Sequence, residues 1–322
     1  MTTLAELEQA ARFIHTIVPP TPQYAWPKIA ARAGYDVWVK HENHTPTGAF
    51  KIRGGLLYMK ELLESGTRVP GVISATRGNH GQSISFAAHR VGIPATIYVP
   101  HGNSPDQNAS MRAFGATVVE FGADFDQARV EAARVASERE LHFVPSFHMT
   151  LVKGVATYAL ELFRAAGELD AVFVPIGMGS GICGMITARD LLGLRTRIIG
   201  VVAEKAPAMA LSFEAGKPVS TPTAKTFADG MATREPQPAA VDIILRGAER
   251  IVRVSEDEIA DAVRVYFDDT HHVVEGAGAA ALAALLKERS HWAGKRVAVV
   301  ASGGNIERAR FERVLNGVTP TA

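Results

Sequence analysis

The sequence has little cysteine, no excess of charge of either sign and no long apolar run. Its single cysteine, Cys183, excludes an intramolecular disulfide framework and fits a reducing compartment. With 34 Lys and Arg against 33 Asp and Glu, the net charge of +1 gives no reason to expect nucleic acid or an anionic membrane as a partner. No window has the apolar length that spans a bilayer, and the N-terminus lacks the basic region of a signal peptide. We therefore predict a cytoplasmic protein with no nucleic-acid and no membrane partner.

The 322 residues have instead the patterns of an α/β protein. Predicted strands at residues 72–74, 95–99, 117–120, 171–176, 197–203 and 297–301 are separated by helical patterns. Strands that alternate with single helices are typical of parallel sheets. Residues 206–238, rich in Pro, Ala, Thr and Gly, are predicted to be a loop-rich excursion. The predicted fold class is α/β, with two open parallel-sheet lobes, flanking helices and a cleft between the lobes.

Lys51 lies where a predicted strand, residues 36–40, leads through a loop into a helix expected at about residues 52–63. Phe50 and Ile52 flank it, and an apolar environment lowers the pKa of a lysine ammonium because it disfavours the charged form. A lysine of that kind can act as a nucleophile or form a Schiff base. Taken alone, Lys51 could equally be a lysine that extends from a helix start into solvent.

A glycine-rich turn, residues 177–181, follows another predicted strand and precedes a helix. Such a turn presents backbone N–H groups that bind phosphate. Residues 179–184 also match G-x-G-x-x-G, and Glu204 follows about twenty residues later, which is the form of a dinucleotide-binding fingerprint. A nicotinamide- or flavin-dependent oxidoreductase is therefore an alternative, although it leaves Lys51 without a role.

Four motifs together resemble one family, the serine/threonine dehydratases among the fold type II, tryptophan-synthase-β-like, pyridoxal-phosphate enzymes. The motifs are Gly48-Ala49-Phe50-Lys51-Ile52-Arg53-Gly54, Gly78-Asn79-His80-Gly81-Gln82, Gly177-Met178-Gly179-Ser180-Gly181 and Ser302-Gly303-Gly304-Asn305. They occur in the family's order and span nearly the whole chain. The resemblance implies pyridoxal 5'-phosphate in the cleft, a discontinuous large domain of residues 1–70 and 149–322, a small domain of residues 71–148, and a homodimer.

The resemblance also implies roles for particular residues. Lys51 is the covalent attachment site of the cofactor and the base that removes the substrate's α-proton. The other implied cofactor contacts are Phe50, Asn79, Gly177, Met178, Gly179, Ser180, Gly181, Glu275 and Ser302, with Ser302 beside the pyridine nitrogen. The implied substrate contacts are Thr76, Arg77 and His80. Arg77 replaces the serine of the family's serine racemases, so efficient racemisation is not expected, and it either pairs with an anionic group of the substrate or faces solvent.

The function that follows is a pyridoxal-phosphate-dependent dehydratase, or ammonia-lyase, of a β-hydroxy-α-amino acid such as L-threonine or L-serine. Its products would be a 2-oxo acid and ammonia. Less common substrates (3-hydroxyaspartate, phenylserine or an amino acid derived from hydroxyectoine) and a β-replacement reaction are the alternatives. No metal site is predicted, because the adjacent His271 and His272 have no third ligand in the sequence pattern. The chain ends about 20 residues after Ser302, so a fused regulatory domain is not expected.

Overall fold

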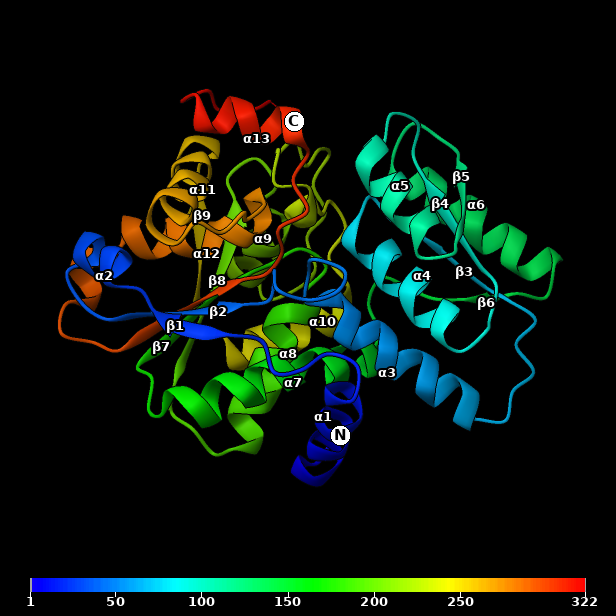
Figure 1. The fold of residues 1–322 in the computed structure, drawn as a ribbon, viewed down its shortest axis with the longest axis horizontal. Helices are drawn as coiled ribbons and strands as arrows, with labels where there is room; N and C mark the ends of the chain where they lie inside the picture. The colour runs from blue at the N-terminus through cyan, green and yellow to red at the C-terminus, as the bar shows by residue number, and fades with distance from the viewer. Residues whose placement is uncertain (1, 322) are drawn as a thin grey trace.

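The computed structural model describes residues 2–321, which form two β-sheets side by side with helices packed around each (Figure 1). The larger sheet has six strands in the spatial order β1-β2-β10-β7-β8-β9. They are β1 (Gln23–Ala25), β2 (Val37–His41), β7 (Ala171–Pro175), β8 (Arg197–Ala203), β9 (Arg250–Val254) and β10 (Val297–Ala301). All neighbours run parallel except β1 and β2, which are antiparallel. This sheet therefore places strands from both ends of the chain side by side.

The smaller sheet is parallel throughout and has the order β5-β4-β3-β6. Its strands are β3 (Val72–Ala75), β4 (Ala95–Val99), β5 (Thr117–Glu120) and β6 (His142–Phe143). Together with helices α4, α5 and α6 it makes the cyan-to-green lobe on the right of Figure 1. The prediction of two parallel-sheet lobes with flanking helices is confirmed.

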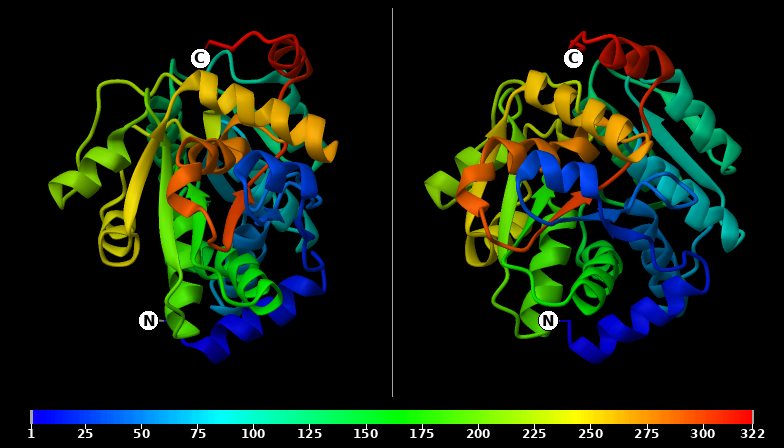
Figure 2. Two further views of the ribbon diagram at one scale, coloured as in Figure 1. Left: turned by 90° about the vertical axis from the view of Figure 1, so that its left-hand side faces the viewer. Right: turned by 60° about the vertical axis from the view of Figure 1, so that its left-hand side comes forward.

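The helices cover both faces of the sheets, as the turned views of Figure 2 show. They are α1 (Leu4–His15), α2 (Pro27–Ala33), α3 (Lys51–Glu64), α4 (Asn79–Arg90), α5 (Pro105–Ala113), α6 (Phe125–Glu138), α7 (Met149–Ala166), α8 (Ser180–Leu191), α9 (Ala208–Ala215), α10 (Pro238–Gly247), α11 (Glu256–Thr270), α12 (Gly276–Lys287) and α13 (Arg308–Leu315), with short 3₁₀ turns at Asp229–Met231 and Arg289–Trp292. Because both faces are covered, a central strand such as β10 is buried along its whole length and is an unbroken run of Val and Ala. Within residues 2–321, no helix has both the length and the apolar character needed to cross a membrane.

Helix α3, which begins at Lys51, joins the two lobes. It packs against α7 of the larger lobe and against α4 of the smaller one. Its crossing with α7 is close because both helices have glycine there: a Cβ at Gly154 would lie 2.4 Å from the carbonyl oxygen of Arg53, and one at Gly54 would lie 2.9 Å from that of Leu151. Because the two helix backbones are in direct contact, the helices have little room to shift against each other. The first turn of α3 is therefore held firmly between the lobes.

The sequence places most elements within one or two residues. The sequence pattern Thr3-Leu4-Ala5-Glu6 predicts a capping box, and this box begins α1 in the structure. Apolar periodicity places the start of one helix near Gln82 and of another at Gly184, whereas α4 begins earlier, at Asn79, and α8 begins earlier, at Ser180. Glycines in both first turns lower the local helix propensity, but the strands before them and the packing around them fix the helical conformation.

Several short elements are not predicted. They are β1, β6, β9, α10 and α13, together with α9, which lies inside the segment predicted to be loop-rich. Strand β6 is only two residues long and pairs with β3 at two positions, so it has no periodicity of its own to detect. Tertiary packing, rather than local pattern, forms these elements.

Candidate active site

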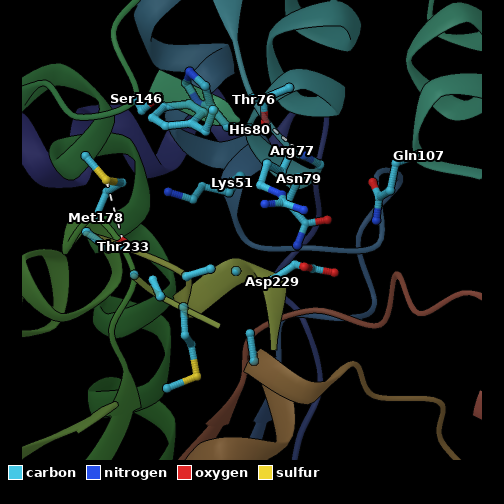
Figure 3. Close-up of a pocket in the computed structure, with 18 of the residues that line it drawn as sticks. Lys51, Thr76, Arg77, Asn79, His80, Gln107, Ser146, Met178, Asp229 and Thr233 are labelled. Carbon is cyan, nitrogen blue, oxygen red and sulfur yellow. Dashed lines mark hydrogen bonds between the residues drawn. The ribbon is translucent and has the colours of Figure 1, made fainter. Parts of the chain in front are cut away.

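The carboxyl ends of strands from both sheets open into one cavity of about 570 Å³ (Figure 3). In open parallel sheets this is the edge where ligands bind. Residues that follow β3, β6, β7 and β10 all contribute to its wall. Every residue assigned to the site from the sequence lies in that wall, and both lobes supply them. The structure thus brings together assigned residues separated by up to 252 positions, from Phe50 to Ser302.

Lys51 is the first residue of α3, and its side chain points into the cavity (Figure 3). Its Nζ donates a hydrogen bond to Ser180 Oγ at 2.9 Å and lies 5.2 Å from the centre of the Phe50 ring. Burial lowers the pKa of Lys51 to about 8. The Ser83 hydroxyl holds the backbone by donating to the Lys51 carbonyl oxygen at 2.6 Å. Lys51 is therefore a fixed amine that loses its proton close to neutral pH.

The glycine turn faces this amine. Gly179 has φ of +100°, a conformation that L side chains rarely adopt, and α8 begins at the next residue, Ser180. Gly177 has no room for a side chain, because a Cβ there would lie 2.1 Å from the carbonyl oxygen of Gly230. The first N–H groups of α8 have no partner within the helix and carry the positive end of its dipole. The turn, with the Ser180 hydroxyl, is an anion-binding cradle.

A chain of amide and carboxyl groups crosses the cavity on the other side of Lys51. Asn79 Nδ2 donates to Glu275 Oε1 at 2.7 Å, and Asn305 Nδ2 donates to Asn79 Oδ1 at 2.8 Å. Gln107 Nε2 in turn donates to the Asn305 carbonyl oxygen at 3.1 Å, and Gln107 Oε1 accepts from Gln82. Asn79, Gln82 and Gln107 belong to the smaller lobe, so these bonds connect the two lobes at the cavity.

Glu275 immediately precedes α12, and its backbone N–H donates to the Gly303 carbonyl oxygen at 3.0 Å. Burial raises the pKa of its carboxyl to about 8, and the bond from Asn79 opposes the rise only in part. Gly303 must be glycine for this contact, since a Cβ there would lie 2.6 Å from Glu275 Oε1. Glu275 is therefore largely protonated at neutral pH and adds no full negative charge to the cavity.

The loop after β3 and the first turn of α4 carry two buried side chains and one exposed side chain at the cavity. Thr76 is buried and its hydroxyl accepts from the backbone N–H groups of Gly78 and Gly81 at 3.0 and 3.2 Å. His80 is also buried, and its Nε2 has no hydrogen-bond partner among the described residues. Burial and then the nearby Lys51 lower the pKa of His80 to about 3, so the ring is neutral. Arg77 is exposed at the cavity wall.

Ser302 follows β10 and is buried in the cavity wall. Its carbonyl oxygen accepts from the Phe50 N–H at 3.1 Å, and the Gly304 N–H donates to the Gly48 carbonyl oxygen at 2.9 Å. The loop before Lys51 is therefore joined to the end of β10 by backbone bonds that no local pattern reveals. This explains why two motifs about 250 residues apart meet at one place.

Two residues of this arrangement had no role in the sequence interpretation. Asn305 was part of a motif, and its position after the last strand was the signal that could have found it. Gln107 gave no such signal, because a glutamine in the first turn of a surface helix is common. Its bond to Asn305 depends on the way the small lobe faces the large one, and its bond to Gln82 depends on the packing of α4 against α5.

The dinucleotide interpretation of residues 179–184 does not fit the geometry. Glu204, the residue expected to bind a ribose, is exposed and lies 3.7 Å from the Lys287 ammonium. It is not part of the cavity wall. The glycines instead face Lys51, which the dinucleotide interpretation leaves without a role.

Comparison with known proteins agrees with the geometry. A family model described as pyridoxal-phosphate dependent enzyme matches residues 14–303. An L-threonine ammonia-lyase of Thermotoga maritima is 33% identical over 317 residues, which cover 98% of this chain and 79% of that protein. A phenylserine dehydratase of Ralstonia pickettii is 35% identical over 319 residues, with 98% and 97% covered. The solved structure of the processed form of threonine deaminase isoform 2 from Solanum lycopersicum superposes with a TM-score of 0.88 at 28% identity, covering 98% of this chain and 94% of that one. Both its motifs and this likeness show that the chain belongs to the pyridoxal-phosphate dependent enzyme family.

Proposed function

We propose that this protein is a pyridoxal-phosphate-dependent dehydratase that converts a β-hydroxy-α-amino acid into a 2-oxo acid and ammonia. The observation that carries the proposal is the Lys51 amine, which is half-buried in the cavity wall and lies 2.9 Å from Ser180 Oγ in the glycine turn. An amine that loses its proton near neutral pH beside an anion cradle suits a phosphorylated aldehyde cofactor. Relatives named as dehydratases and ammonia-lyases of hydroxy amino acids support the same reaction class.

The residues in the cavity fit this cofactor. The N-terminus of α8 with residues 177–181 would bind the phosphate, and Lys51 would be the attachment site. Asn79 and Ser302 offer neutral polar groups to the ring, and Phe50 and Met178 contribute apolar surface. When bound, pyridoxal phosphate withdraws electrons from the Cα of the attached amino acid and so makes its α-proton acidic. Ser302, as a neutral hydroxyl, does not hold the ring nitrogen in its charged form as an aspartate would.

Side chains of the protein carry out the proton transfer and bind the substrate. The Lys51 amine accepts the α-proton, because its lowered pKa leaves it partly unprotonated near neutral pH. The C–O bond at Cβ breaks, and the hydroxyl takes up the proton that Lys51 accepted and leaves as water. The resulting enamine tautomerises to an imine, which water hydrolyses to the 2-oxo acid and ammonia. From the family resemblance, Thr76, Arg77 and His80 are the contacts we propose for the substrate carboxylate, and all three line the cavity. Because Glu275 is largely protonated, it places no full negative charge near that carboxylate.

L-Threonine and L-serine are the substrates we propose first. A β-aryl serine is the second candidate. Five phenylalanines line the cavity (Phe50, Phe125, Phe143, Phe147 and Phe227), and a relative of nearly equal length is named phenylserine dehydratase. Aromatic side chains would contact an aryl substituent favourably. We also propose, from the family resemblance, the domain division at residues 70/71 and 148/149, a homodimer and a cytoplasmic location.

The cofactor is tested by the absorption spectrum of the purified protein before and after borohydride. A violet-blue band that borohydride bleaches, with the label recovered on Lys51, is the expected result. Lys51→Ala should lose both the band and turnover, and Lys153→Ala, which changes an α7 lysine outside the cavity wall, should keep both. A protein without the band after incubation with pyridoxal phosphate would overturn the proposal.

The reaction is tested with a panel of hydroxy amino acids, scored by 2-oxo acid and ammonia. Equal amounts of both products from threonine, serine or phenylserine are expected. A repeat with added thiol separates elimination from β-replacement, since a replacement enzyme would form a thioether amino acid and release little oxo acid. Full turnover in Lys51→Ala would contradict the role of Lys51.

A further inference from the structure

Three histidines from two distant parts of the chain form a cluster outside the cavity. His41 ends β2, His44 lies in the loop after it, and His272 lies between α11 and α12. One ring nitrogen from each lies within 4.8 Å of the other two. The ring centre of His272 is 4.7 Å from that of His41 and 4.5 Å from that of His44. None of the three lines the cavity, so the cluster is separate from the site described above.

Two of these rings have a buried nitrogen that makes no hydrogen bond among the described residues. His41 is fully buried, and its Nδ1 has no partner among the described residues. The Nδ1 of His272 is in the same situation. Buried polar atoms in folded proteins nearly always have a partner, so two unpartnered nitrogens in one cluster are consistent with a water or an ion between the rings. Burial, followed by the other two rings, lowers the pKa of His41 to about 3, and burial lowers the pKa of His44 and His272 as well.

We propose that His41, His44 and His272 bind one divalent transition-metal ion, with Zn²⁺ as the ion of choice and water as the fourth ligand. Neutral imidazole is the form that binds metal, and a set of imidazoles suits Zn²⁺, Ni²⁺ or Cu²⁺ better than Mg²⁺ or Ca²⁺. Nitrogens at the usual Zn–N distance of about 2.0–2.1 Å in a tetrahedral site are roughly 3.4 Å apart. Side-chain movements of less than about 1 Å bring the three nitrogens into that range. His44 is exposed and leaves water an open path to the ion.

Trp26 competes with the metal for His41. Its Nε1–H donates to His41 Nε2 at 2.9 Å, and an indole N–H cannot accept. His41 Nε2 is therefore unprotonated, and the ring's proton lies on Nδ1. An ion at Nε2 would have to displace the indole donor, and an ion at Nδ1 would have to displace the proton that the indole keeps there. Either way the Trp26 bond weakens metal binding.

The ion would connect the two segments that lead to the cavity. His44 lies seven residues before Lys51, and His272 lies three residues before Glu275. Asn43 Nδ2 already donates to the Val273 carbonyl oxygen at 3.2 Å, so the segments touch without metal. A ligand that binds only the folded chain stabilises it in proportion to its concentration and affinity. Metal binding should therefore raise the melting temperature whether or not the enzyme turns over.

The test is titration of the chelator-treated holoenzyme with Zn²⁺, followed by calorimetry and thermal unfolding. We expect one ion per chain and a Tm that rises with Zn²⁺ concentration. Co²⁺ in its place should give the visible d–d bands of a tetrahedral site. His44→Ala and His272→Ala should each weaken binding at least about tenfold, because each removes one of three ligands. His101→Ala, which changes an exposed histidine of the smaller lobe, should leave binding unchanged.

Trp26→Phe should change the Zn²⁺ affinity in the opposite direction, and it tests whether His41 is a ligand. Loss of the indole donor should tighten Zn²⁺ binding several-fold. Unchanged or weaker binding in this variant would show that His41 is not a ligand, which overturns the three-histidine site. The proposal also fails if binding does not saturate at one ion, or if His101→Ala lowers it as much as His272→Ala does.

Discussion

Two side chains of the cavity show how position alone changes what a residue does. Glu275 is a carboxyl whose pKa burial raises to about 8, and Arg77 is a cation at the wall of the same cavity. The first is therefore largely neutral where a carboxylate would be expected, and the second offers the positive charge that an amino-acid carboxylate needs. Each role leads to a measurable consequence.

Glu275→Gln tests the protonation of Glu275. Between pH 4.5 and about 8 the folded protein keeps a proton on Glu275 that the unfolded chain releases. The folded state binds more protons there, so this group makes the free energy of unfolding fall as pH rises through that range. Glutamine has no proton to lose but can still accept from Asn79. The variant should therefore lose that part of the pH dependence in denaturant unfolding measured from pH 5 to 8. The control Glu64→Gln, at the exposed end of α3, should keep the wild-type dependence of the unfolding free energy on pH. The same dependence in Glu275→Gln would contradict the prediction.

Arg77→Ala tests the binding of the carboxylate. A hydrogen bond to a charged group contributes about 1.5–3 kcal/mol, so its loss should raise KM roughly 10- to 100-fold. The effect on kcat should be smaller, because the carboxylate is bound in both the ground state and the transition state. Arg77→Lys should keep part of the affinity, since it keeps the charge without the planar fork. Steady-state kinetics with L-threonine measures KM and kcat for both variants. A fall in kcat at constant KM would assign Arg77 to the chemical step instead.

At the scale of elements, a buried ion network fixes α3 behind Lys51. Arg53 donates to Glu42 at 2.7 and 2.9 Å and to Glu161 of α7 at 2.5 and 3.0 Å. Lys40 of β2, fully buried, also donates to Glu161, at 2.6 Å. Strand β2, helix α3 and helix α7 therefore share two carboxylates, and the turn that carries Lys51 is held by charge as well as by the close glycine contacts.

Glu161→Ala should be strongly destabilising because it leaves Arg53 and Lys40 buried with one carboxylate between them. Removal of one partner from a buried ion pair costs about 3–5 kcal/mol. Glu64→Ala removes an exposed carboxylate from the Lys60 pair on the same helix α3 and should cost little. Urea unfolding of both variants measures the difference. Equal stability of the two would show that the network does not hold α3.

At the scale of the whole molecule, ion pairs also cross the mouth of the cavity. Arg234, in the segment between α9 and α10, pairs with Asp126 at the start of α6 and lies 3.6 Å from Asp124. Arg129 of α6 lies 3.9 Å from Glu235. These side chains belong to opposite lobes and line the same cavity. They hold the lobes together at the cavity wall, in addition to the bonds of Asn79 and Gln107.

Arg234→Ala should raise KM a few-fold and leave the free energy of unfolding nearly unchanged. The pair is partly exposed, so it contributes little to stability, but it favours the closed arrangement in which the substrate groups converge. Added salt should weaken the wild-type pair in the same way and reduce the difference between wild type and variant. Arg134→Ala, whose partners Glu131 and Glu138 lie on its own helix, is the matched control and should not alter KM. A KM equal to wild type in Arg234→Ala would contradict a role in closure.

The sequence by itself determined the fold class and part of the cavity wall, including the lysine and the glycine turn. Strand periodicity is local, so β4, β5, β8 and β10 could be placed within a residue. The glycine turn before α8 and the lysine at the start of α3 are also local, because a sharp strand-to-helix junction needs particular residue types in a row. The resemblance to one family then joined motifs that no periodicity connects.

Only the tertiary structure decided how these groups act on one another. The pKa of Lys51 depends on burial between two lobes. The pKa of Glu275 is raised by burial and partly lowered again by the bond from Asn79, 196 positions away. The same is true of Gln107 at the lobe junction and of His272, which the sequence pairs with His271 and the fold instead places beside His41 and His44. Such contacts arise from the order of strands in a sheet and the packing of helices across it. Hydrogen bonding and desolvation act over a few ångströms in space, so neighbours in the folded chain, not neighbours in the sequence, set the chemistry of the site.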